Sequence, residues 1–149
     1  MKKSEIKPAL DALKKIKMPK IEDKALRNDI IENHFVLLAA GKKFDADNEA
    51  DQSVRLSGYD AEQQAIKDLQ DKFNLAESDA DRRDINRKML SHKDYFKAVE
   101  DLNKSLTDRG KEAVEGLKPI DRVKFMEEIE KQEYDLGMIA DLYPLFNIE

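Results

Sequence analysis

Metal-ligating side chains are few in this sequence, and their spacing does not match common metal sites. His34 and His92 are the only histidines, and there is no cysteine. A di-iron helical bundle needs a glutamate three residues before each histidine, because that spacing points both side chains into the core. Those positions hold Ile31 and Met89. A zinc-protease motif needs two histidines four residues apart, which the sequence lacks. We interpret His34, which lies on an apolar stripe, as a hydrogen-bonded core or boundary residue.

An acidic alternation is the strongest hint of a cation site. Acidic residues occupy every second position from Asp45 to Asp51, as at the start of a calcium-binding loop. Such a loop also needs a sharp turn at its sixth position and a bidentate glutamate at its twelfth. Those positions hold Ala50 and Leu56. We therefore expect neither a metal ion nor another cofactor, and we interpret residues 45–59 as an exposed acidic connector.

Patterns typical of catalysis are missing from the sequence. A phosphate-binding loop needs a glycine at both ends of a tight turn, but Val36 stands five positions before Gly41. Nucleophilic catalysis needs a serine or threonine beside a positioned base, and no such residue lies in a glycine-rich elbow. Carboxylates are so numerous that their proximity in sequence is uninformative. We predict that the protein is not an enzyme.

Charge is unevenly distributed along the chain, although the net charge is −5. Residues 1–24 contain eight lysines and four acidic residues, whereas residues 121–149 contain three basic and eight acidic residues. Four lysines near the N-terminus are candidate partner-binding residues: Lys14, Lys15, Lys17 and Lys20. The negative net charge and the lack of interleaved aromatic residues argue against nucleic-acid binding. A solvated helix face is the simpler interpretation of these lysines.

The C-terminal segment from Met138 to Phe146 is too apolar for a solvated tail. Its large apolar residues form the second group of candidate partner-binding residues: Leu142, Tyr143, Leu145 and Phe146. A chain end is normally mobile unless it is anchored, and exposed apolar area of this size reduces solubility. The segment should therefore dock on the protein's own helices or bind a second copy or another protein. We favour docking on the protein's own helices.

Apolar residues at helical spacing predict the first two helices. One should begin at Pro8, because proline lacks the N–H that has no partner at a helix start. It should stop before Pro19, whose ring disfavours helical geometry in the preceding residue. The next should run from about Ile21 to Gly41 or Phe44, because its apolar stripe has the width of a core-facing helix.

Capping signals divide the middle of the chain. Asp60 and Gln63 have the spacing of a capping box, and Ser78 or Asp79 is the predicted N-cap of the following helix. The sequence from there is compatible with two helices or with one that is kinked near Ser91. These segments predict a central helical hairpin.

The predicted fold is mainly all-α, an irregular helical bundle that forms one domain over residues 1–149. Residues 120–136 fit a helix that begins at Asp121, although their spacing also leaves strands open. A short β element is thus the alternative in residues 45–58 or 120–136. Few glycines and prolines argue against a β-sandwich, which needs frequent turns.

Composition also bears on location. No run approaches the ~18–20 apolar residues of a membrane span, so we expect no membrane contact. The N-terminus has no apolar segment typical of a secretory signal, and the lack of cysteine fits a reducing cytosol. We expect a cytoplasmic protein.

Two ends of the chain resemble a small, uncharacterised protein family of tailed bacteriophages and prophages, often encoded near tail genes. The matching residues are Leu10-x-x-Leu13, Lys17-Met18-Pro19, Leu26, Ile31 and Asp141-Leu142-x-Pro144-Leu145-Phe146. The resemblance implies a phage-encoded protein in the bacterial cytoplasm or the virion, and it implies no particular chemistry because the family has no established activity.

These observations favour a non-enzymatic helical interaction or assembly protein with a protein partner, either another protein or a second copy of the chain. The first alternative is a small phage inhibitor that sequesters a host protein or a nucleotide. The second is a nucleic-acid accessory protein that uses the N-terminal lysines.

Overall fold

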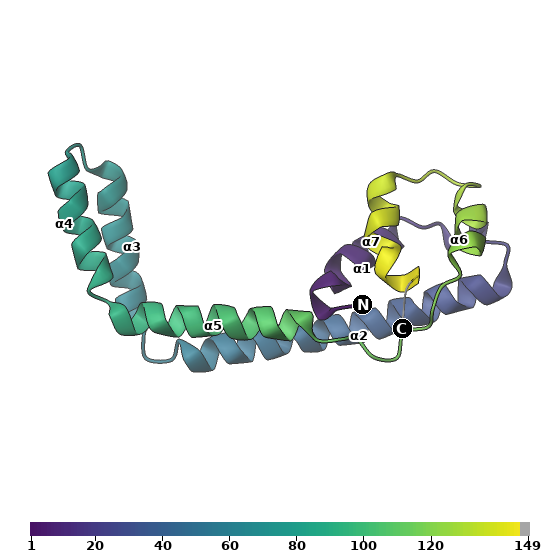
Figure 1. The fold of residues 1–149 in the computed structure, drawn as a ribbon, viewed down its shortest axis with the longest axis horizontal. Coiled ribbons are helices and arrows are strands. Elements are labelled where there is room, and N and C mark those ends of the chain that lie inside the picture. The colour runs from purple at the N-terminus through teal and green to yellow at the C-terminus, as the bar shows by residue number, and fades with distance from the viewer. Residues whose placement is uncertain (147–149) are drawn as a thin grey trace. The chain divides into compact units, whose positions relative to one another are not determined.

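The computed structural model describes residues 1–146, and its regular secondary structure is helical throughout that range (Figure 1). The helices are α1 (Ile6–Lys14), α2 (Lys24–Arg55), α3 (Asp60–Leu75), α4 (Asp79–Leu90), α5 (Lys93–Lys111), α6 (Arg122–Ile129) and α7 (Leu136–Phe146). Two 3-10 turns, η1 (Lys3–Glu5) and η2 (Met18–Lys20), flank α1. The all-α prediction is confirmed.

Two compact units divide the chain, which the sequence analysis treated as one domain. We call Met1–Ala46 with Asp108–Glu149 the core unit and Asp47–Thr107 the hairpin unit. The boundaries fall inside the long helices α2 and α5. Each unit is described separately below.

The core unit buries apolar side chains from α1, α2, α6 and α7. In α1 the buried positions have the three- and four-residue spacing of an amphipathic helix. Helices α1 and α7 lie side by side and pack on each other (Figure 1). The most deeply buried apolar residues are Ala9, Ala12, Leu13, Ile21, Ile30, Leu37, Phe125, Ile129, Met138, Leu142 and Leu145. Segments far apart in sequence thus share one core.

Close helix packing in the core unit depends on a glycine. A Cβ atom at Gly41 would lie 3.2 Å from Cγ2 of Ile6, which is a tight contact. The missing side chain therefore lets α1 approach α2.

The N-terminus is tied to the segment after α5 by two backbone hydrogen bonds, Lys3 N to Glu112 O at 2.8 Å and Val114 N to Met1 O at 3.0 Å.

A buried asparagine on α2 holds the loop before α6. Asn33 is fully buried, and its Nδ2 donates to the carbonyl oxygen of Lys118 at 2.8 Å. The backbone N–H of Lys118 donates to Oδ1 of Asn33 at 2.7 Å. The side-chain amide therefore satisfies both backbone groups of one loop residue, which fixes the loop on the helix.

The hairpin unit is built around the packed pair α3 and α4 (Figure 1). Neither of these two helices contains a fully buried residue. Their half-buried apolar residues include Ile66, Leu69, Phe73, Ile85 and Met89. The predicted central helical hairpin is present, but it has only a thin apolar seam.

The prediction of an exposed acidic connector at residues 45–59 is wrong for most of that range. Helix α2 continues to Arg55, and only a short turn precedes α3. Residues of α5 and of α2 itself stabilise the extension. Ser105 Oγ donates to Oδ2 of Asp51 at 2.6 Å, and Arg55 pairs with Asp51 one helical turn away. The acidic alternation therefore lies on a helix, where residues two apart point to nearly opposite sides and cannot wrap one cation.

The β alternatives at residues 45–58 and 120–136 are also wrong. Residues 122–129 form α6, and the only β feature within residues 1–146 is an isolated bridge between Lys2 and Ala113. A helix at Asp121 was expected, and α6 begins at the next residue. Asp121 is its N-cap, because its carboxylate accepts from the N–H groups of Val123 and Lys124.

Other local predictions had mixed outcomes. Ser78 caps α4 by accepting from the Asp81 N–H, as expected. Asp60 is the first residue of α3, with Tyr59 at the N-cap, so the predicted capping box is wrong. The region around Ser91 contains two helices, and Ser91 Oγ donates to the carbonyl of Lys88 at the end of α4.

Candidate interaction surface

The apolar C-terminal segment forms α7 and docks on the protein's own helices. Leu142 and Leu145 are 1% and 2% exposed, and the half-buried Phe146 ring lies 5.1 Å from the ring of Phe125. Their burial corrects the assignment of Leu142 and Leu145 as partner-binding residues, because both belong to the core. Tyr143 differs, since it is 53% exposed.

A second apolar face of α7 remains exposed. Leu136 is 81% exposed, and Ala140 is also exposed. Residues separated by four and seven positions share one side of a helix, so Leu136, Ala140 and Tyr143 form a single stripe, which we call the outer face of α7. Apart from Asp141, no residue between Leu136 and Phe146 is charged.

The sequence analysis found Tyr143 but missed Leu136 and Ala140. The repeat at four and seven positions was present in the sequence as a signal. It was hidden because α7 is apolar on both sides, so periodicity alone could not separate the inner from the outer face. A helix that is apolar all round is typical of a buried element, which makes an uncovered outer face informative.

The four candidate lysines have different surroundings in the structure. Lys14 lies 3.7 Å from Asp11 of its own helix, and Lys15 lies 3.8 Å from Asp135. Lys17 is fixed through its backbone N–H, which donates to Oε1 of Gln132 at 2.8 Å. Lys20 is exposed in η2. Two of the four thus lie within 4 Å of an acidic side chain of the same protein, in exposed ion pairs of the kind that contribute little.

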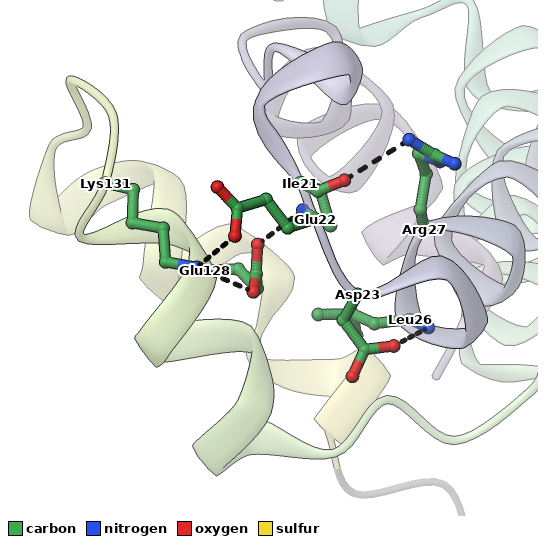
Figure 2. Close-up of polar contacts among 7 residues, drawn as sticks. All are labelled: Ile21, Glu22, Asp23, Leu26, Arg27, Glu128 and Lys131. Carbon is green, nitrogen blue, oxygen red and sulfur yellow. Dashed lines mark hydrogen bonds and ion pairs between the residues drawn. The ribbon is translucent and has the colours of Figure 1, made fainter.

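A polar cluster in the core unit joins α6 to the segment before α2 (Figure 2). The Glu128 carboxylate accepts from the backbone N–H of Glu22 at 2.7 Å and from Nζ of Lys131 at 3.0 Å. Lys131 also reaches the Glu22 carboxylate at 3.4 Å. In the same segment, Asp23 accepts from the Leu26 N–H and so caps the start of α2.

The electrostatics of this cluster favour the charged forms of Glu128 and Lys131. The hydrogen bond from the Glu22 N–H, followed by that from Lys131, lowers the pKa of Glu128 below its ordinary value of 4.5. Hydrogen bonding to Glu128 conversely raises the pKa of Lys131. Both side chains therefore keep their charges at neutral pH. A general acid needs a carboxyl pKa raised towards the working pH, which is the opposite direction. The cluster fastens α6 to the chain before α2.

Neither histidine belongs to a group of side chains that could hold a metal ion within residues 1–146. His34 is half-buried on α2 beside the ring of Phe35, as a boundary residue would be. His92 Nδ1 lies 3.4 Å from the carboxylate of Glu62. Among residues 1–146, no group of three or more histidine, cysteine or acidic side chains is arranged to hold a metal ion. In the same range, no helix combines the length and apolar character needed to cross a membrane.

Comparison with models of protein families, with curated protein sequences and with solved structures finds no match.

Proposed function

We propose that this protein is a non-enzymatic interaction protein that binds another protein through the outer face of α7. The observation behind the proposal is that α7 has two apolar faces, of which one is buried and the other is exposed. The inner face is in the core, and the outer face presents Leu136 at 81% and Tyr143 at 53% exposure. Large aromatic and aliphatic side chains of this kind act as anchors in protein interfaces.

The surroundings of the outer face indicate the chemistry of its partner. Exposed acidic residues occur beside it in sequence: Glu133, Asp135 and Asp141. Of these, Asp135 is paired with Lys15. A partner surface with an apolar centre and a lysine- or arginine-rich rim would match this arrangement, since opposite charges at a rim favour association.

The role we propose is that of an assembly factor, with a virion component as the partner. The phage-family resemblance of the two chain ends supports this choice over a host protein. Binding to a host enzyme instead would identify the protein as an inhibitor that works through the same surface.

The test is capture of a partner by tagged full-length protein, followed by direct binding of the two purified proteins. The double variant Leu136→Asp/Tyr143→Asp should lose the complex and keep the wild-type melting temperature, because both side chains are outside the core. Val123→Asp is the matched control, since Val123 is 67% exposed on α6 and should bind like the wild type. A complex that survives the double variant would contradict the proposal.

A further inference from the structure

Two shallow surface grooves in the hairpin unit have opposite charge patterns. The first, which we call the Leu75 groove, lies between α3 and α4 and is lined by Lys72, Leu75, Ala76, Asp81, Asp84 and Ile85. The second, the Leu90 groove, lies at the end of α4 and on α5 and is lined by Leu90, Lys93, Phe96, Lys97 and Glu100. Both contain apolar side chains that water reaches.

Three large apolar side chains of these grooves are exposed. Leu75 is 82% exposed, Leu90 is 58% exposed and Phe96 is 39% exposed. Because α3 and α4 have no fully buried residue of their own, these side chains offer apolar surface that this unit could still bury. Further burial would stabilise a hairpin whose seam is thin.

The charged residues that line the two grooves are opposite in number and sign. The Leu75 groove has two acidic residues and one lysine, whereas the Leu90 groove has two lysines and one glutamate. Asp84 and Lys97 already form ion pairs within their own helices, with Lys88 and Asp101. These pairs are exposed and therefore weak, so they can exchange for pairs across an interface.

The geometry of α4 prevents the two grooves from meeting within one chain. Asp81 lines the first groove and Leu90 lines the second. Residues nine positions apart lie half a turn from each other on an α-helix, at about 3.6 residues per turn. The grooves therefore open on opposite sides of α4, and each must find its complement on another molecule.

We propose that a second copy of this chain occupies the grooves, with Leu75 of one copy inserted between Leu90 and Phe96 of the next. The interface is heterologous, because each copy contributes a different groove, and such contacts extend head to tail or close into a ring. Both complementary halves are present on one chain, which favours a second copy over an unrelated partner. The contact uses no residue of α7 and is independent of the proposed function.

The test is sedimentation of the full-length protein over concentrations from ~1 µM to ~1 mM, a range that covers weak self-association. We expect the mass to rise with concentration beyond that of a dimer. Leu75→Asp and Leu90→Asp should each weaken this association at least about tenfold, and circular dichroism should show intact helices, since both sites are on the surface. Val123→Asp, at a valine of α6 that is 67% exposed and lies outside both grooves and the outer face of α7, should assemble like the wild type.

Mixing the two variants tests the head-to-tail geometry. The Leu75→Asp copy retains an intact Leu90 groove, and the Leu90→Asp copy retains an intact Leu75. An equimolar mixture should therefore form a complex of one copy of each and nothing larger. A second pair of variants distinguishes a lost contact from an unfolded protein. Asp81→Lys/Asp84→Lys and Lys93→Glu/Lys97→Glu should each fail to assemble alone and should assemble when mixed, which unfolded proteins would not do. A wild-type protein that stays monomeric throughout, or mixtures that fail to associate, would overturn the proposal.

Discussion

Replacement of Asn33 by alanine should destabilise the core unit, because this buried side chain hydrogen-bonds α2 to the loop before α6. Asn33 is fully buried. Its amide donates to and accepts from the backbone of a single residue, Lys118, at 2.8 and 2.7 Å. No buried side-chain nitrogen or oxygen in residues 1–146 is without a partner. Alanine would leave both backbone groups of Lys118 unpaired unless water entered.

The expected loss follows from the cost of those two groups. A buried donor or acceptor that loses its partner costs about 1–3 kcal/mol, whereas a typical hydrogen bond contributes a net ~0.5–1.5 kcal/mol. Because Lys118 is itself an exposed residue, water can replace the lost partner, and two hydrogen bonds at their net value place the loss in the free energy of unfolding at about 1–3 kcal/mol. Asn33→Asp should be similarly harmful, because a carboxylate cannot donate to the carbonyl of Lys118.

Urea unfolding followed by circular dichroism would measure this loss. Asn28→Ala is the matched control, because Asn28 is an exposed asparagine on the same helix and its replacement should change stability by less than about 0.5 kcal/mol. An Asn33→Ala protein as stable as the Asn28→Ala control would refute the reasoning. It would mean that the loop is held by its other contacts.

Three further predictions concern charge and packing. Because the pKa of Glu128 is lowered in the folded state, its ionised form stabilises the fold above its ordinary pKa of 4.5. Glu128→Gln should therefore lose stability at neutral pH, and its deficit in urea unfolding should shrink as the pH falls below 4.5. Gly41→Val should destabilise the fold by about 1–3 kcal/mol in thermal melts, because it crowds Ile6. Lys14→Glu/Lys17→Glu should leave DNA retention in gel-shift assays unchanged, since we expect no tight complex at physiological salt; a tight complex lost in this variant would favour the nucleic-acid alternative.

Sequence alone determined the features that depend on neighbouring residues. Helix periodicity identified the all-α class, and the caps at Ser78 and Asp121 were predictable because an N-cap side chain bonds to a backbone group two or three residues away. The apolar pattern near the C-terminus likewise predicted a docked segment. These signals lie within one or two helical turns and need no knowledge of the rest of the chain.

Only the tertiary structure decided features that depend on distant residues. The polar stretch from Asp45 to Arg55 lacks an apolar stripe, yet it is helical where Ser105 contacts Asp51 from another helix. In the sequence Asn33 is an ordinary polar residue, and its role follows only from its two hydrogen bonds to Lys118 in the folded chain. Which side of α7 faces α1, and hence whether Leu142 or Leu136 is exposed, is equally invisible in a helix that is apolar all round. All three cases have the same physical reason. The burial of a side chain and its hydrogen-bond partners depend on segments that come together only when the chain folds, and the pattern of neighbouring residues does not specify those segments.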